Sequence, residues 1–177
     1  MTESDDLILV RRALKADPES FNELCQRYYH PLVAIANSVL MDGHLAEDAA
    51  QEALAQACRQ LPTLKKPEMF GPWVGAICRN MAKDMLNEQI RERKINYNHQ
   101  IQEKVPDEND DEVILAKVLQ SLPQELREVV FLKFFNEKSY EQMANILGIT
   151  EQAIDGRLRR AKKRIALYLE KNRFRRQ

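Results

Sequence analysis

Glycine is scarce in this sequence of 177 residues, with only five glycines in all. Runs of β-branched residues, which strands favour, are also few. The apolar residues instead recur every three or four positions, which is the spacing of amphipathic helices. These features exclude a protein built on strands and predict an all-α fold of small helical domains.

Long apolar runs are absent as well. The longest strongly apolar run lies near residues 129–135, "VVFLKFF", and Lys133 interrupts it. A helix needs about 20 apolar residues to cross a bilayer. The first ten residues, "MTESDDLILV", begin acidic and lack the positive start and apolar stretch of a secretory signal. We therefore expect a cytoplasmic protein without membrane insertion.

Cysteine is too sparse for a disulfide framework or a zinc site. Cys25, Cys58 and Cys78 are odd in number and widely spaced, and none has a close Cys or His neighbour in the sequence. We expect all three to be small buried hydrophobic residues. The three histidines also lie apart, and no nucleotide-binding loop or nucleophile with a base is visible. The sequence thus predicts neither an enzyme nor a cofactor or metal site.

Net charge is zero, but the charge is sorted along the chain. Residues 1–94 carry a net charge of −2, residues 95–115 carry −5, and residues 116–177 carry +7. Residues 157–176 alone hold ten Lys or Arg and a single acid, Glu170. This sorting predicts a basic C-terminal part suited to a polyanion and an acidic connector that a polyanion would repel.

The acidic connector marks a domain boundary. Residues 95–111, "INYNHQIQEKVPDENDD", lose the helical spacing and are rich in Asn, Asp and Glu. Such a composition is typical of a solvated linker. We expect one helical domain in residues 1–94 and another in residues 112–177.

The first part shows two strong helical patterns. In one, Asp17 and Pro18 begin a helix that Pro31 should kink or divide. In the other, "LAEDAAQEALAQACRQL", one apolar stripe is predicted to face the core, and the opposite face carries Asp48, Gln51 and Glu52. The stripe consists of Ala50, Ala53, Leu54, Ala57 and Leu61.

Residues 139–164, "SYEQMANILGITEQAIDGRLRRAKKR", have the layout of a helix-turn-helix. Ser139 and Gln142 are spaced for a capping box, and Gly148 can end the first helix in a left-handed conformation. Thr150 can then cap the second helix. The predicted inward-facing residues are Met143, Ala144 and Leu147 in the first helix and Ala153, Ile154, Leu158 and Ala161 in the second.

The outer face of the second helix is basic, and such a motif can insert that face into a DNA major groove. Gln152 and Asp155, near its start, would meet base edges, and the cations further along would meet phosphates. A solvated basic face with no DNA partner is the alternative. The predicted duplex-binding residues are Gln152, Asp155, Gly156, Arg157, Arg159, Arg160 and Lys163.

Three blocks of the sequence resemble, in order and spacing, the extracytoplasmic-function (ECF) sigma factors of the sigma-70 family. They are "LAEDAAQEALAQACRQL", "FGPWVGAICRNMAKDML" and the run from Leu122 to Ile165 that contains the helix-turn-helix. The resemblance implies that residues 1–94 are the region 2 domain and residues 112–177 the region 4 domain. It implies a sigma factor that binds core RNA polymerase and directs promoter-specific transcription initiation.

The resemblance also implies partners. The helix that carries Asp48, Gln51 and Glu52 would contact the β′ clamp helices of core RNA polymerase, and region 4 would contact the β flap. An ordinary solvated helix face is the alternative for these three residues. Promoter DNA and an anti-sigma factor are the further partners that the resemblance implies.

The second block matches the segment that captures melted minus-ten DNA in that family. Unstacked bases need aromatic surfaces, amides that read base edges, and cations for the backbone. Packing in the core of the bundle is the alternative for Phe70 and Trp73. The predicted minus-ten residues are Phe70, Trp73, Arg79, Asn80, Lys83 and Asn87, with Asn80 the leading candidate for a base contact.

The sequence departs from the family pattern at two places. Asn87 and Glu88 stand where positive charge is expected, so duplex contact there should be weaker. In the recognition helix, Asp155 and Gly156 replace a Lys and a Ser. Asp155 should accept a hydrogen bond from a cytosine amine or point away from the DNA, and Gly156 suggests a close approach of the backbone.

Two other functions fit parts of the sequence. A helix-turn-helix regulator could bind an operator as a dimer without polymerase, although residues 1–94 would then have no role. A helical interaction module could use the same amphipathic faces to bind another protein. The linker could occupy nucleic-acid space in the polymerase, as the resemblance suggests, or be a plain tether.

Overall fold

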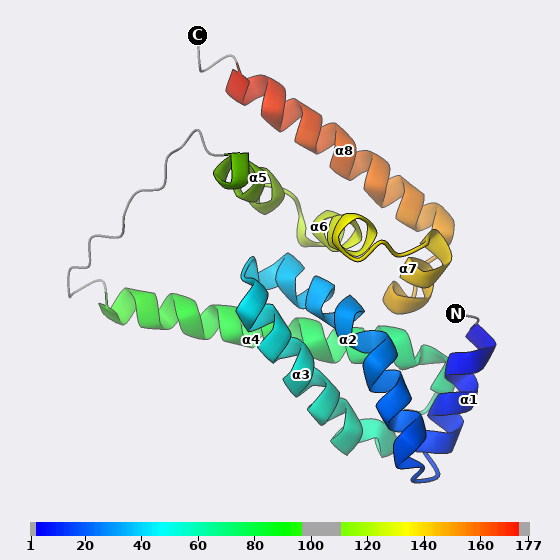
Figure 1. Ribbon diagram of the computed structural model, residues 1–177. Helices are drawn as coiled ribbons and strands as arrows, with labels where there is room; N and C mark the ends of the chain where they lie inside the picture. Colours follow the sequence, from blue (N-terminus) through cyan, green and yellow to red (C-terminus); the bar gives the residue numbers. More distant parts are fainter. Residues whose placement is uncertain (1–2, 97–110, 174–177) are drawn as a thin grey trace.

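The computed structural model describes residues 3–96 and 111–173, and every regular element in those two ranges is helical (Figure 1). This confirms the predicted all-α class. The predicted linker, residues 95–111, lies largely outside the described ranges. The main helices are α1 (Glu3–Ala13), α2 (Pro18–Leu40), α3 (Gly43–Gln60), α4 (Phe70–Asn96), α5 (Asp111–Gln120), α6 (Gln124–Val130), α7 (Tyr140–Leu147) and α8 (Glu151–Arg173). Three shorter elements are the 3-10 turns η1 (Leu61–Thr63) and η2 (Pro67–Met69) and the π-helical turn η3 (Phe131–Phe135).

Helices α2, α3 and α4 pack on one another and form the core of the N-terminal half. Aspartates begin two of these helices: Asp17 accepts from the backbone N–H groups of Glu19 and Ser20, and Asp42 from that of Leu45. The predicted stripe on α3 is buried throughout, and alanine at most of its positions allows the neighbouring helices to approach closely.

Helix α2 does not divide at Pro31. It continues from Pro18 to Leu40 with Pro31 inside it, so of the two expected outcomes, a kink or a division, the division is wrong. Pro31 and the following Leu32 are both buried. Their packing in the core offsets the hydrogen bond that the proline cannot donate.

Helix α1 was not predicted as an element. It packs along α2, and Asp6 joins the two helices by accepting hydrogen bonds from the Tyr28 hydroxyl at 2.8 Å and from Arg27 Nη1 at 2.9 Å. The partly buried carboxylate of Asp6 thus pairs with a cation, which is the condition under which burial of a charge is tolerated.

The three cysteines differ in burial. Cys78 is buried and Cys25 half-buried, but Cys58 on α3 is exposed, which corrects the expectation that all three lie in the core. Burial raises the pKa of Cys78 from its ordinary 9.0 to about 12 and that of Cys25 to about 11. The Cys78 thiol donates to the backbone carbonyl of Leu32 at 3.4 Å.

The C-terminal half consists of α5 to α8, with α6 packed against α8. The helical chain from Gln124 changes character at Phe131, where α6 passes into η3. Phe131 and Leu132 point into the core, whereas Phe134 and Phe135 are exposed. Within the described ranges, no helix is long and apolar enough to cross a membrane.

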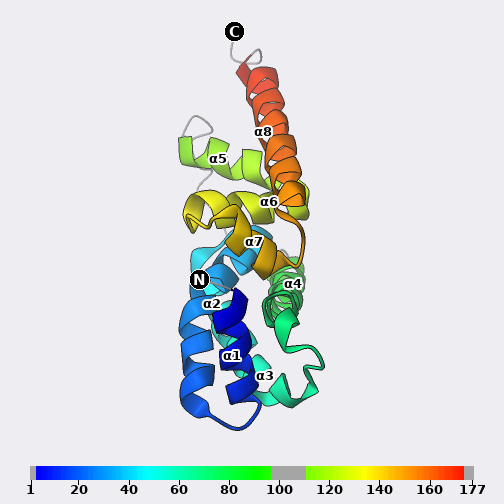
Figure 2. The ribbon, with the colours of Figure 1, turned by 90° about the vertical axis from the view of Figure 1, so that its right-hand side faces the viewer.

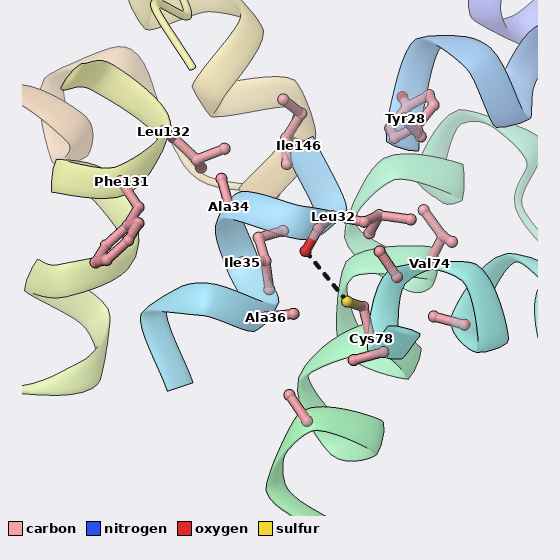
Figure 3. Close-up of a cluster of buried hydrophobic side chains, with 14 of the residues drawn as sticks. Tyr28, Leu32, Ala34, Ile35, Ala36, Val74, Cys78, Phe131, Leu132 and Ile146 are labelled. Atoms are coloured by element: carbon pink, nitrogen blue, oxygen red, sulfur yellow. Dashed lines mark hydrogen bonds between the residues drawn. The ribbon is translucent and has the colours of Figure 1, made fainter. Parts of the chain in front are cut away.

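The two halves are in direct contact (Figure 1 and Figure 2). Helix α7 packs on α4, and α2 packs on α6 and η3. Buried hydrophobic residues from both halves form one connected cluster. Figure 3 shows this contact, where Leu132 of η3 lies beside Ala34 of α2.

Candidate nucleic-acid interface

Helices α7 and α8 form the predicted helix-turn-helix. Ser139 Oγ accepts from the backbone N–H of Gln142 at 3.1 Å, and the Gln142 side chain accepts from the N–H of Ser139 at 3.0 Å, which completes the capping box. Gly148 has a φ of 68° and donates to the carbonyl of Ala144 at 2.8 Å. Thr150 Oγ1 accepts from the N–H of Ala153 at 3.1 Å and so begins α8. The local hydrogen bonds therefore fix the angle at which α8 leaves the turn.

The buried residues of this motif are nearly those that were predicted to face inward. On α8, Ile154, Leu158 and Ala161 are buried, and on α7 Met143 is fully buried. Ile146 is buried as well, although its position lies outside the predicted stripe. Because α7 packs on α4 as well as on α8, it has two apolar sides and not one.

The outward side of α8 carries the predicted duplex-binding residues. Gln152, Arg159, Arg160 and Lys163 are exposed, and Asp155, Gly156 and Arg157 are half-buried. Arg159 Nε lies 3.0 Å from Asp155 Oδ2, and Arg157 Nη2 lies 3.7 Å from Glu125 Oε2 on α6. Arg157 and Arg159 are therefore paired with acids of the same half, and Arg160 and Lys163 are exposed next to them.

Gly156 is not required by packing inside the protein. A Cβ atom at this position would meet no other atom within 4 Å. Glycine in the middle of a helix costs about 1 kcal/mol relative to alanine. A close approach of the α8 backbone to DNA therefore stays the prediction for Gly156.

Helix α4 holds the predicted minus-ten residues, and it divides them between the core and the surface. Phe70 is 2% exposed, and its ring packs at 5.1 Å from that of Tyr28 and at 5.9 Å from that of Trp73. Trp73 is half-buried against the same cluster. In this arrangement Phe70 fills the core of the bundle, which was the alternative to a base contact. A base could stack on the Phe70 ring only if the ring became uncovered.

The polar members of the set lie further along α4. Asn80, Lys83 and Asn87 are exposed, and their spacing of three and four residues places them on one face of the helix. Arg79 differs from them. Its side chain is 21% exposed, and its Nε donates to Glu128 Oε1 of α6, in the other half of the protein.

Asp48, Gln51 and Glu52 are all exposed on α3. Their spacing places them on one face, opposite the buried alanines. Glu52 also pairs with Arg59 at 2.9 Å. The structure thus exposes these three residues together on one face of α3.

Sequence reasoning missed the residues that join the two halves. Glu128 pairs with Arg79, and Asn136 Nδ2 donates to the carbonyl of His30 at 3.1 Å. Gly71 and Gly75 face the backbone of α7. Their spacing of four residues on one helix was visible in the sequence and could have indicated a close helix contact.

Two sequence models of known families match this chain in order. The model described as "Sigma-70 region 2" matches residues 24–92, and the one described as "Sigma-70, region 4" matches residues 112–165. The first match runs from Leu24 in α2 through α3 and most of α4, and the second covers the described C-terminal half as far as Ile165 on α8.

Several curated proteins are similar along most of the chain. The ECF RNA polymerase sigma-E factor of Escherichia coli K12 is 28% identical over 176 residues, covering 90% of this chain and 92% of the relative. The RNA polymerase sigma-H factor of Pseudomonas aeruginosa is 25% identical over 93% of this chain and 94% of its own length. A Xanthomonas campestris protein named "Probable RNA polymerase sigma factor RfaY" is 28% identical over 78% of this chain, but this chain spans only 39% of that relative.

Solved structures share the fold. A structure described as CnrH in complex with the cytosolic domain of CnrY matches with a TM-score of 0.62 at 23% identity, covering 94% of this chain and 97% of that one. The sigma factor RpoE in complex with the anti-sigma factor NepR, from Bartonella quintana, matches with a TM-score of 0.54 at 23% identity, covering 86% of this chain and 98% of that one.

Proposed function

We propose a division of labour within this protein, which belongs to the ECF branch of the sigma-70 family of RNA polymerase sigma factors. A sigma factor binds core RNA polymerase and directs it to promoters. Residues 1–94 would be the region 2 domain and residues 112–177 the region 4 domain. The observation that carries this assignment is the order of the two family matches, each of which falls on one half of the described structure.

Region 4 would recognise minus-thirty-five duplex DNA through α8. Caps fix both ends of α7 and the start of α8, and α8 presents Gln152 near its start and Arg160 and Lys163 further along. This arrangement is the one by which a recognition helix reads base edges with its first turns and binds phosphates with its later ones. Arg157, Arg159, Asp155 and Gly156 complete the proposed surface.

Region 2 would hold the melted minus-ten strand along α4. Asn80, Lys83 and Asn87 share one exposed face, which combines two amides that can read base edges with one cation for the backbone. Trp73 and Arg79 would join them, and Phe70 would support Trp73 from the core through their ring contact.

Core polymerase would be bound through the α3 face that holds Asp48, Gln51 and Glu52, by way of its β′ clamp helices, with the β flap on region 4. The three side chains are exposed and adjacent, and their two acids give the face a negative charge. An anti-sigma factor would be a further partner, because the sigma factor RpoE, which shares the fold, is described in complex with the anti-sigma factor NepR. We place the protein in the cytoplasm with its polymerase, and we assign it no catalytic chemistry of its own.

The test is binding of the full chain to purified core RNA polymerase, measured by fluorescence anisotropy. We expect a stable complex that the triple substitution D48A/Q51A/E52A weakens at least tenfold. The matched control is E19A/N22A/E23A, which removes a similar set of exposed polar groups from α2. Equal affinity of the triple variant and the control would show that the α3 face does not contact core polymerase. If the protein retards duplex DNA on a gel but does not bind core enzyme, it is an operator-binding regulator.

A further inference from the structure

The contact between the two halves is built for close approach. Gly71 and Gly75, one turn apart on α4, both face the backbone of α7. A Cβ at Gly71 would lie 2.8 Å from the carbonyl oxygen of Asn145, and one at Gly75 would lie 3.6 Å from that of Ile146. At the turn of the helix-turn-helix, a Cβ on Gly148 would lie 2.8 Å from Cγ of Pro72. Any side chain at Gly71 or Gly148 would therefore push the halves apart.

Polar contacts complete this close approach. Arg79 pairs with Glu128, whose side chain is only 6% exposed, and Asn136 donates to the backbone carbonyl of His30. Leu132 and Ile146, both from the C-terminal half, are buried in the cluster shared with α2 (Figure 3). The interface thus combines apolar burial, one buried ion pair and one hydrogen bond to backbone.

The ion pair involves the same cation that the proposed function assigns to nucleic acid. Arg79 precedes Asn80 directly, and its guanidinium would serve the phosphates of the melted strand. A carboxylate and a phosphate offer the same kind of oxygen to a guanidinium. While Glu128 accepts from Arg79 Nε, a phosphate cannot accept from that N–H group, and the carboxylate repels a phosphate that approaches the other N–H groups of the guanidinium.

In this structure the two proposed DNA-binding sites also lie too close together to contact both promoter elements. The minus-ten and minus-thirty-five elements are about 25 base pairs apart, which is roughly 85 Å along a duplex that rises 3.4 Å per base pair. Here α7 of the duplex-binding motif touches α4 of the proposed minus-ten site. The two sites cannot reach both elements at once while this contact lasts.

We propose that Glu128 is an internal stand-in for a nucleic-acid phosphate, which holds Arg79 and keeps the free protein in a closed, DNA-incompetent state. Opening separates α7 from α4, exposes Gly71, Gly75 and Pro72, and frees Arg79 for the melted strand. Phosphates of the single strand and Glu128 then compete for one guanidinium. The inference rests on the proposed function for the role of Arg79, whereas the closed contact itself is independent of that role.

The test uses the full chain without polymerase. Cys58 is exposed, and burial raises the pKa of Cys25 and Cys78, so thiol dyes at neutral pH attach to Cys58 and to a second site made by K162C on α8. Energy transfer between the dyes reports the separation of the halves. A fluorescein-labelled single-stranded oligonucleotide reports nucleic-acid binding by the same chain without the dyes.

Glu128→Gln keeps the shape of the side chain and removes the charge that holds Arg79. We expect lower energy transfer and about fivefold tighter binding of the oligonucleotide, because apparent affinity follows the fraction of competent molecules. The matched control is Glu125→Gln, which makes the same change one turn away on α6, at an exposed acid that pairs with Arg157 of its own half. The control should keep the transfer efficiency of the parent.

Asn136→Ala gives an independent route to the open state, because it removes the hydrogen bond to His30 without touching any charge. Unchanged energy transfer in both Glu128→Gln and Asn136→Ala would overturn the proposal, as would equal opening by Glu128→Gln and Glu125→Gln. A failure of this proposal can be told apart from a failure of the proposed function. Opening is measured on the protein alone, whereas the proposed function is measured with core RNA polymerase present. Opening without tighter oligonucleotide binding would remove Glu128 as the competitor for phosphate.

Discussion

Asp155 and Arg159 form an ion pair one turn apart on the outer face of α8, with 3.0 Å between Oδ2 and Nε. The acid therefore holds a cation that would otherwise be free for a phosphate. The side chain of Arg159 is 74% exposed, so water screens the pair and its contribution to stability is small. Its effect is expected on DNA binding and not on folding.

Asp155→Asn should increase the affinity for duplex DNA about threefold, because it removes a negative charge near the phosphates and releases Arg159. The dependence of log K on log salt should steepen by about 0.9, the value for one added phosphate contact. Titration of labelled duplex at several salt concentrations measures both. The control is Glu170→Gln, which makes the same charge change near the far end of α8. If Asp155→Asn instead weakens binding, and only to sites that contain cytosine, Asp155 accepts a hydrogen bond from a cytosine amine.

Arg160→Ala should weaken binding to all duplex sequences alike and reduce the salt slope by about 0.9, because Arg160 is exposed beside the proposed groove contacts and would meet a phosphate. The same titration measures this effect, with Arg59→Ala on α3 as the control for loss of an exposed arginine. A salt slope equal to that of the parent would remove Arg160 from the phosphate contacts.

Asn80→Ala should impair formation of the open promoter complex and leave core binding intact, because Asn80 is exposed on α4 and lies away from the proposed polymerase-binding face of α3. Permanganate reactivity of unpaired thymines measures opening, and anisotropy measures core binding. Asn22→Ala, at an exposed position of α2, is the matched control. Equal loss of opening and of core binding would mean that Asn80 has a structural role.

Stability should fall as pH rises above about 9. The folded state keeps the protons of Cys78 and Cys25, whose pKa values burial raises to about 12 and about 11, while the unfolded chain loses them near 9.0. The folded state then binds more protons than the unfolded one, so the free energy of unfolding decreases with pH in that window. Urea denaturation at a series of pH values measures the slope, and a slope that is the same in the C25A/C78A variant would contradict this origin.

Sequence patterns predicted the elements that local chemistry determines. The capping box of Ser139 and Gln142, the left-handed Gly148 and the alanine stripe of α3 each depend on residues close in the chain, and the structure confirms them. Such features need no knowledge of what packs against the helix.

What the sequence did not predict depends on contacts between distant segments. Ile146 is buried because α7 packs on α4, and Arg79 is engaged because Glu128 lies 49 residues further along the chain. Pro31 stays inside α2 because its surroundings bury it. Cys58 is exposed and lies at the edge of the buried stripe of α3, which the helical spacing could have shown.

The measurement that tests the account most directly is the mapping of transcription start sites on genomic DNA by purified core RNA polymerase, with and without this protein. We predict a set of start sites that require the protein and share two sequence elements upstream, spaced as minus-ten and minus-thirty-five. The control is that the same core enzyme transcribes normally with another sigma factor. If it does, and no start site depends on this protein, the assignment as a sigma factor is contradicted.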